Sequence, residues 1–199
     1  MTKVYTGASV SLDGYIAGPG ESGFEYLFKW LGNGDVEVPT ANPDIPIRTT
    51  AVSAEHFGGV IAQTGALVVG RRLFDLTNGW GGTHPMGVPV VVVTHNPPEN
   101  WPRGGTPFTF VSEGIERAVE EAKALAGDKV VGVNGGMMAS QCLDAGLLDE
   151  VWVDLVPVLL GGGTPYFDRL RRAPVELDGP ISVTESTDVT HLRYRVRYR

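Results

Sequence analysis

Short apolar runs recur along the 199-residue chain, and segments with helical spacing of hydrophobic residues separate them. Runs such as VPVVVVT are almost continuously apolar, which is typical of strands covered on both faces. The pattern predicts strands at 3–10, 65–70, 88–94, 129–133 and 149–160. It predicts helices at 24–31, 53–63, 113–126 and about 136–145, with another that starts in the segment GRRLFD at 70–75. Residues 32–50, rich in Gly, Asn and Pro, are expected to form an irregular excursion.

Cap residues mark several of the predicted helix ends. Ser53 and Ser112 stand where a hydroxyl can accept a hydrogen bond from the first turn of a helix. Gly127 and Gly146 stand where a helix is expected to end.

The C-terminal segment THLRYRVRY alternates strictly, which predicts a half-solvated, antiparallel strand. One face carries Leu192, Tyr194, Val196 and Tyr198, and the other carries His191, Arg193, Arg195 and Arg197. The basic face is expected to be solvated and to discourage edge pairing. Strands that alternate with helices and then follow one another predict an α/β fold, with a mostly parallel sheet and antiparallel C-terminal strands. We expect a single domain over 1–199.

Composition narrows the classes of function. The net charge of −7 argues against nucleic acid as a partner, because contacts to phosphates dominate that affinity. No run is apolar enough for a membrane span, and the first residues lack the pattern of a signal peptide. One cysteine, Cys142, excludes an internal disulfide, and the scattered histidines show no metal-binding spacing. We expect a cytoplasmic protein without a metal, which binds small anions only through local arginines and backbone N–H groups.

The Gly135-Gly136 pair lies where a predicted strand passes into a helix. One interpretation is a turn that requires glycine. The other is a phosphate cradle, because a helix N-terminus offers free N–H groups and glycine lets a pyrophosphate approach. The dinucleotide fingerprint G-x-G-x-x-G is not matched here, so both interpretations stay open.

Gly70, Arg71 and Arg72 form a second candidate, again at a strand-to-helix junction. Two arginines at the positive end of a helix are unfavourable unless an anion binds there, and the guanidinium fork suits phosphate. The alternative is a solvated pair in which Asp75 of the same helix is a partner.

Two further candidates follow other strands. Thr94 follows the strand at 88–94, and Asp13 follows the first strand in a turn-forming Asp-Gly pair. Ligands of parallel sheets bind at the carboxyl ends of strands, so Gly70, Thr94 and Gly135 are expected to converge on one edge. Asp13 is either a turn residue or the nearest proton donor.

The ordered motifs SLDGYIAGP, GRRLF, VVVT, GVNGG and GLLDEVWVDLVPVLLGGGTPYF span almost the whole chain. In this order they resemble the dihydrofolate reductase-like superfamily, specifically the group related to the C-terminal reductase domain of the bacterial riboflavin-biosynthesis deaminase-reductase. The resemblance implies a three-layer α/β fold, NADPH as hydride donor, and a homodimer built on the C-terminal strands.

The resemblance also implies the residues that bind NADPH. The Gly-Gly turn and its neighbours are expected at the pyrophosphate and nicotinamide: Val133, Gly135, Gly136, Met137 and Met138. The adenosine half is expected at Gly70, Arg71, Arg72 and Thr94. The loop from Asp13, with Ile16 and Ala17, is expected to cover the nicotinamide.

The chain departs from the family pattern at two places. Leu73 stands where many dihydrofolate reductases have a phosphate-binding threonine, and the acid that anchors a pterin has only Glu25 nearby. The zinc-deaminase signature H-x-E with P-C-x-x-C is missing from the sequence. The chain is therefore not expected to perform the zinc-dependent deaminase step. Because of the two departures at Leu73 and Glu25, folate is not the expected substrate either.

The expected activity is NADPH-dependent hydride transfer to a C=N or C=O of a small heterocyclic or sugar-derived substrate. Asp13 is its candidate catalytic residue. The alternatives are 5-amino-6-(5-phosphoribosylamino)uracil reductase of riboflavin biosynthesis and a non-catalytic nucleotide-binding protein.

Overall fold

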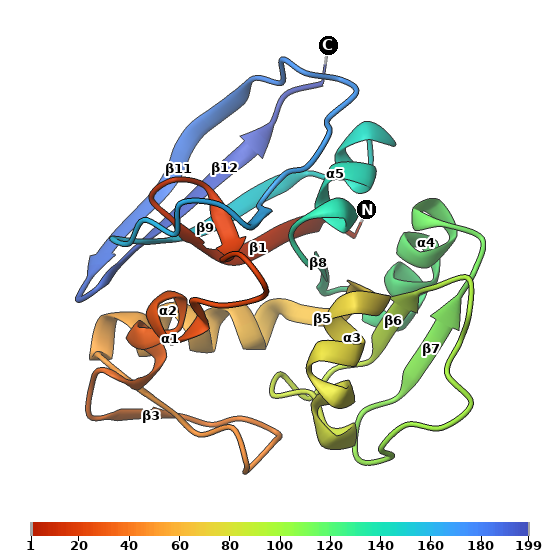
Figure 1. Ribbon diagram of the computed structural model, residues 1–199, viewed down its shortest axis with the longest axis horizontal. Helices are drawn as coiled ribbons and strands as arrows, with labels where there is room; N and C mark the ends of the chain where they lie inside the picture. Colours follow the sequence, from red (N-terminus) through yellow and green to blue (C-terminus); the bar gives the residue numbers. More distant parts are fainter. Residues whose placement is uncertain (1, 199) are drawn as a thin grey trace.

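An eight-stranded sheet forms the centre of the molecule in the computed structural model, which describes residues 2–198 (Figure 1). From one edge to the other its strands are β11 (Leu177–Ser186), β12 (Val189–Val196), β9 (Glu150–Val156), β1 (Val4–Ser11), β8 (Val130–Val133), β5 (Thr64–Gly70), β6 (Val90–Val93) and β7 (Phe108–Val111). The strands from β9 to β7 run parallel, whereas β12 and β11 are antiparallel additions. This confirms the predicted sheet.

Helices cover both faces of the sheet, so the fold has three layers. Helices α4 (Ile115–Ala126) and α5 (Met137–Asp144) lie on one side, and α2 (Ala51–Gln63) and α3 (Arg71–Leu76) lie on the other (Figure 1). The alternation of strand side chains explains this arrangement. Val68 of β5 is buried in the cluster that contains α4 and α5, whereas its neighbour Val69 packs with Phe74 of α3.

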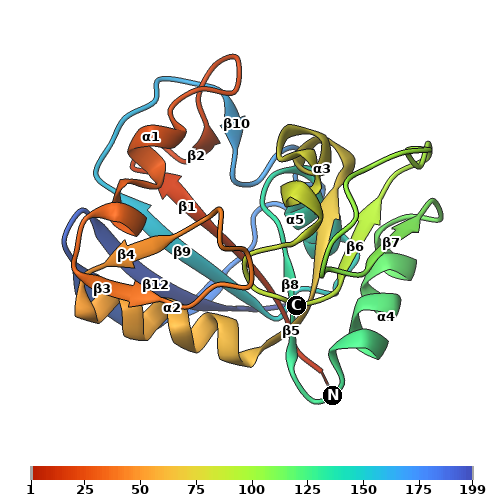
Figure 2. The ribbon, with the colours of Figure 1, turned by 90° about the horizontal axis from the view of Figure 1, so that it is seen from below.

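Three short helices and two small two-stranded sheets complete the chain. The predicted helix at 24–31 is broken at Phe28 into α1 (Phe24–Leu27) and the 3-10 helix η1 (Lys29–Gly32), and η2 spans Asn78–Gly82. The excursion at 32–50 contains the hairpin of β3 (Val36–Val38) and β4 (Ile47–Thr49). A separate two-stranded antiparallel sheet pairs β2 (Tyr15–Ala17) with β10 (Thr164–Pro165), and Figure 2 shows it beside α1.

Both predicted serine caps are wrong. Helix α2 begins two residues before Ser53, and Thr50 accepts the hydrogen bond from the Ser53 backbone N–H at 3.2 Å. Helix α4 begins after Gly114, while Ser112 hydrogen-bonds to Glu113 instead. The predicted ends are correct, because Gly127 (φ 60°) and Gly146 (φ 74°) both follow helices in conformations that favour glycine.

Strand ends also differ from the prediction. Strand β9 stops at Val156, and 157–163 leave the sheet as a glycine-rich loop rather than continuing the strand to 160. Strand β7 was not predicted, because four residues between Gly- and Pro-rich segments give too short a pattern. In β12 the expected solvated row is broken, since His191 is 1% exposed and faces α2. No helix among residues 2–198 is long and apolar enough to cross a membrane.

Candidate active site

The carboxyl ends of β5 and β8 are joined by one side chain, that of Asn134. Its Oδ1 accepts a hydrogen bond from the Gly70 N–H at 2.9 Å, and its Nδ2 donates to the carbonyl of Gly135 at 2.9 Å. The structure therefore brings together Gly70 and Gly135, which lie 65 positions apart in the sequence. Sequence analysis missed Asn134, although its position directly before the Gly-Gly pair is a usable signal.

A cavity of about 320 Å³, here called the rim cavity, opens at this edge of the sheet. Most of the predicted cofactor-binding residues line it: Ile16, Ala17, Gly70, Arg71, Arg72, Gly135, Gly136, Met137 and Met138. Sequence analysis missed the other lining residues, namely Glu21, Phe24, Leu73, Leu76, Val93, Asn134, Thr164 and Asp168. These come from five separate stretches of the sequence, which explains why no single motif contains them.

The two glycines of the turn are required for different reasons within the chain itself. A Cβ at Gly135 would lie 2.9 Å from Ile16 Cδ1 and 2.9 Å from Cδ2 of Tyr166, which is too close for a carbon contact. Gly136 has φ 74° and ψ −137°, a conformation that side chains with a Cβ rarely adopt. The turn interpretation therefore accounts for both glycines without a ligand.

Anion-binding capacity at the rim cavity comes from two helix N-termini. Helices α3 and α5 both begin there, after Gly70 and Gly136, and neither has a side-chain cap. The Gly136 N–H is engaged, because it donates to the Tyr166 carbonyl at 2.8 Å. The remaining backbone donors at these two helix starts are those of the first helical turns, which also carry the positive ends of the helix dipoles.

Both arginines of the rim cavity already have carboxylate partners. Arg71 Nε lies 2.7 Å from Asp75 Oδ1, as the solvated alternative predicted, and Arg71 also donates to the Asn96 carbonyl. Arg72 pairs with Glu21 of the loop before α1. Their side chains are 34% and 70% exposed, so both guanidinium groups can exchange these partners for an incoming anion.

Three predicted site residues do not line the rim cavity. Thr94 follows Val93 at the same edge, where its Oγ1 accepts a hydrogen bond from the Asn96 N–H at 3.2 Å. Val133 lines the neighbouring cavity described below. Asp13 lines none of the hollows that we describe and lies in the exposed turn after β1.

Asp13 fastens two loops together. Its Oδ1 accepts hydrogen bonds from Ser11 Oγ at 2.5 Å and the Leu160 N–H at 3.1 Å, and its Oδ2 accepts one from the Gly161 N–H at 2.7 Å. The Ser11 bond, together with these backbone N–H groups, holds the pKa of Asp13 below its usual value. An ionised, exposed carboxylate with these partners favours the turn interpretation over that of a proton donor.

The loop that Asp13 fastens leads into the cover of the rim cavity. Strand β10 pairs with β2 there, so that Thr164 lies opposite Ala17. Gly163 precedes β10, and a Cβ on it would lie 2.1 Å from the Ala17 carbonyl oxygen. Gly163 of the GGGTPYF motif is thus required because the backbone there lies very close to that of Ala17.

A second cavity of about 300 Å³, here called the aromatic cavity, adjoins the rim cavity and shares Leu73 and Asn134 with it. It lies on the α2 and α3 face of the sheet. Its aromatic lining consists of Tyr5, Phe28, Trp30, Phe57, Trp80 and Trp152. Its titratable residues besides Tyr5 are His56, His84 and Asp154.

A hydrogen-bonded chain of polar side chains runs from this cavity into the core. Asp154 Oδ1 lies 3.4 Å from His56 Nε2 and 2.6 Å from His191 Nδ1. His191 Nε2 lies 3.0 Å from Ser53 Oγ, and the two imidazole rings stack at 3.8 Å. Burial raises the pKa of Asp154, but the hydrogen bonds from His191 and His56 outweigh it, so the pKa lies below its usual value. Sequence analysis missed this cluster, whose members are scattered over 139 positions.

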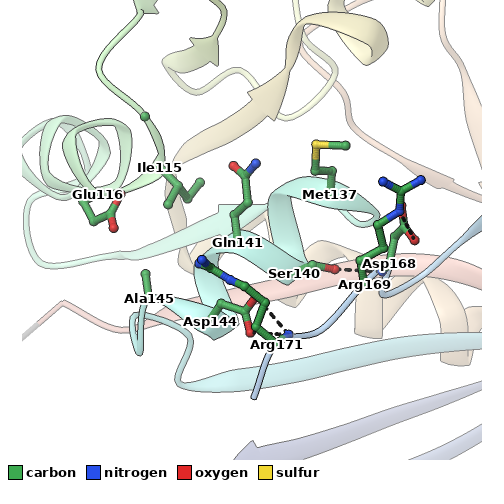
Figure 3. A pocket seen from close by; sticks show the side chains of 11 residues that line it. Ile115, Glu116, Met137, Ser140, Gln141, Asp144, Ala145, Asp168, Arg169 and Arg171 are labelled. Atoms are coloured by element: carbon green, nitrogen blue, oxygen red, sulfur yellow. Dashed lines mark hydrogen bonds and ion pairs between the residues drawn. The ribbon is translucent and has the colours of Figure 1, made fainter. Parts of the chain in front are cut away.

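A third hollow of about 420 Å³ lies between the start of α4 and α5, and it shares Met137 and Asp168 with the rim cavity (Figure 3). Gln141 of α5 points into it between these helices (Figure 3). Two arginines at its border are engaged with carboxylates: Arg171 with Asp144 at 3.2 Å and Arg169 with Asp168 at 3.7 Å. This hollow extends the rim cavity along α5.

The strand order, the antiparallel C-terminal strands and the cavity at the edge of β5 and β8 define a dihydrofolate reductase-like α/β protein. The chain belongs to the RibD C-terminal domain family, whose model matches residues 2–179. The resemblance inferred from the sequence is therefore confirmed.

Solved structures show the same fold at low identity. A putative riboflavin biosynthesis protein from Shewanella sp. PV-4 is 23% identical, with a TM-score of 0.73, and 99% of this chain and 100% of that one are covered. Dihydrofolate reductase from Enterococcus faecalis, complexed with NADP(H), is 15% identical, with a TM-score of 0.56 and coverage of 98% and 97%.

A diaminohydroxyphosphoribosylaminopyrimidine deaminase/5-amino-6-(5-phosphoribosylamino)uracil reductase from Thermotoga maritima is 15% identical, with a TM-score of 0.62. The match covers 98% of this chain but 57% of that protein. No curated protein matches the chain.

Proposed function

We propose that the chain is a cytoplasmic reductase that uses NADPH to reduce a C=N or C=O bond of a small heterocyclic or sugar-derived substrate. The observation that carries this proposal is the start of two helices, α3 and α5, at one cavity without side-chain caps and beside two arginines. Helix N-termini with free N–H groups favour phosphate. Membership of the RibD C-terminal domain family supports the same conclusion.

The residues of the rim cavity fit a dinucleotide phosphate. Arg71 and Arg72 are the proposed partners of the adenosine phosphates, with Gly70 and Thr94 at the same edge. The first turn of α5, at Met137 and Met138, receives the pyrophosphate.

The proposed nicotinamide end lies farther along the same cavity. Ile16 and Ala17 cover the ring, with Gly135 and Gly136 beside it in the rim cavity and Val133 on the side of the aromatic cavity. When bound, the cofactor supplies the hydride. The chain's own part is to orient both reactants and to exclude water.

Calorimetric titration with NADPH tests cofactor binding, and a panel of pterins, pyrimidines and quinones tests turnover through the loss of NADPH absorbance. We expect micromolar binding and NADPH oxidation with at least one acceptor class. Absence of NADPH binding would refute the proposal. Tight binding with no oxidation by any acceptor would instead favour a non-catalytic nucleotide-binding protein.

A second candidate is 5-amino-6-(5-phosphoribosylamino)uracil reductase, which the family match favours. This activity requires the chain to accommodate the phosphate of the substrate as well as those of the cofactor. Incubation with the aminouracil substrate and NADPH tests it directly, with the ribitylamino product detected by mass spectrometry. A product peak dependent on NADPH supports this candidate, and its absence in an otherwise active preparation removes it.

We also propose a homodimer built on the C-terminal strands. Strand β11 ends the sheet and exposes Leu177, Ile181 and Val183, of which Val183 is 51% exposed. A closed two-fold interface would cover these side chains in both copies. Light scattering at micromolar concentration should give a dimer for the parent and for the control Leu125→Lys on α4, but a monomer for Val183→Lys. A monomeric parent would contradict the proposal.

A further inference from the structure

The charge balance of the aromatic cavity does not favour a phosphate. Asp154 is the one carboxylate among its lining residues, and none of them is lysine or arginine. Burial lowers the pKa of His84 to about 4, so its ring is uncharged at neutral pH. The guanidinium of Arg193 lies 4.0 Å from the Trp152 ring but does not line the cavity. A phosphate placed in this cavity would have no lysine or arginine to pair with.

Asp154 presents one free acceptor to this cavity. The partners from the chain, His191 and His56, both contact its Oδ1. No hydrogen bond from residues 2–198 reaches Oδ2, and the Asp154 side chain is 21% exposed. A carboxylate with a lowered pKa is ionised and only accepts hydrogen bonds. A ligand group that pairs with Oδ2 must therefore be a hydrogen-bond donor.

The aromatic walls of the cavity favour a flat ligand. Tyr5 and Trp152 stack with their ring centroids 3.7 Å apart, and Trp30 and Trp80 contribute further aromatic surface. Flat π-systems pack well on such walls, and a cation gains further attraction from the ring faces. The volume of about 300 Å³ is at the lower end of ligand cavities, which suits a molecule of one or two rings.

We propose that the aromatic cavity binds a flat ring that carries N–H groups on one edge and donates hydrogen bonds from them to Asp154. A phosphate group on this ligand would add no affinity within the aromatic cavity. The inference rests on the proposed function, because it identifies this ligand as the substrate beside the nicotinamide. His191 hydrogen-bonds to the Asp154 carboxylate on the side of the core, and Ser53 hydrogen-bonds to His191 in turn. Asp154 thus determines which substrates bind and in which orientation.

Benzamidine, benzoate and phenyl phosphate serve as probes, because they combine the same flat ring with an N–H fork, a carboxylate or a phosphate. Quenching of tryptophan fluorescence reports binding, since Trp30, Trp80 and Trp152 line the cavity. We expect benzamidine to bind the parent at least tenfold more tightly than either anion. Equal or tighter binding of phenyl phosphate would overturn the inference, and this comparison requires no variant.

Asp154→Asn keeps the shape of the side chain but removes the charge, and it should weaken benzamidine binding at least tenfold. Glu55→Gln is the matched control, because Glu55 is an exposed carboxylate of α2 that lies outside the aromatic cavity. It should bind benzamidine like the parent, which excludes adsorption to the acidic surface. Equal loss in both variants, or none in Asp154→Asn, contradicts the inference.

NADPH titration of the same proteins separates this inference from the proposed function. We expect Asp154→Asn to bind NADPH as the parent does, because Asp154 does not line the rim cavity. If the parent selects benzamidine but does not bind NADPH, the reductase proposal fails and the ligand preference of the cavity stands. If NADPH binds but the probes are not discriminated, only the inference about the substrate fails.

Discussion

Replacement of Arg71 or Arg72 by alanine should reduce the preference for NADPH over NADH. The additional phosphate of NADPH carries the charge that distinguishes the two cofactors, and these guanidinium groups are the cations of the rim cavity among residues 2–198. Because each arginine is paired with a carboxylate, the phosphate must displace Asp75 from Arg71 or Glu21 from Arg72. The measurable effect is therefore a difference between two ion pairs.

The magnitude follows from the exposure of these pairs. A hydrogen bond to a charged group contributes about 1.5–3 kcal/mol, whereas an exposed pair four residues apart in a helix contributes about 0.3–0.5 kcal/mol. The net loss per arginine is about 1–2.5 kcal/mol, or roughly 5- to 70-fold in the ratio of the two dissociation constants. Arg72 should lie at the lower end, because it is 70% exposed. Asp75→Asn removes the competitor of Arg71 and should tighten NADPH binding about twofold.

Calorimetric titration with both cofactors at fixed ionic strength measures these ratios. Arg117→Ala is the matched control, since Arg117 is an exposed helical arginine with its own carboxylate partners, Glu120 and Glu121, far from the rim cavity. It should leave both dissociation constants unchanged. An unchanged NADPH/NADH ratio in both Arg71→Ala and Arg72→Ala would refute the reasoning, even if NADPH itself binds.

Three further predictions concern glycine, pH and the first loop. Gly135→Ala should destabilise the fold by roughly 1–3 kcal/mol in urea unfolding, because its Cβ collides with Ile16 and Tyr166. The control Gly58→Ala in α2, where a Cβ meets open space, should be neutral or stabilising. Equal effects of the two substitutions would contradict the packing explanation. The pKa of His84 is about 4 in the folded protein and about 6.5 in the unfolded chain. Between these pH values the unfolded state binds more protons, so the free energy of unfolding should fall by roughly 2–3 kcal/mol from pH 6.5 to pH 4. His84→Asn should flatten this slope, and an unchanged slope would locate the titration elsewhere. Asp13→Asn should keep turnover within about tenfold of the parent, whereas a fall of about 10²–10⁴-fold would restore Asp13 as the proton donor.

The sequence predicted the sheet better than the elements around it. Continuous valine runs, as in β6, have few interpretations other than a buried parallel strand, and all of the predicted strands are present. Strand β7 and the helix break at Phe28 depend on short segments in which tertiary packing decides the conformation. The two serine caps failed because Thr50, three positions before Ser53, and Gly114, two positions after Ser112, take the N-cap positions.

Of the candidate site, the sequence predicted those parts that a motif carries. Gly70, the two arginines and the Gly-Gly turn each follow a strand, so their convergence follows from parallel topology alone. The polar chain at the aromatic cavity has no such signal. His191 belongs to an alternating strand whose pattern indicated solvent, but the packing of α2 and of Trp30 buries it against Ser53 and Asp154.

The Gly-Gly turn shows why a glycine motif alone does not establish a ligand site. Gly135 is fixed by Ile16 and Tyr166, Gly136 by its backbone conformation and Gly163 by the Ala17 carbonyl, so chain packing suffices to explain all three. A Gly136→Val variant would therefore strain the backbone whether or not a phosphate binds, and its loss of binding would not distinguish the two interpretations. The features that packing leaves unexplained are the uncapped starts of α3 and α5, which lie beside two arginines whose exposed carboxylate partners an anion can displace. Because an anion would satisfy these groups, the arginines discriminate between a turn and a cradle more sharply than the glycines do.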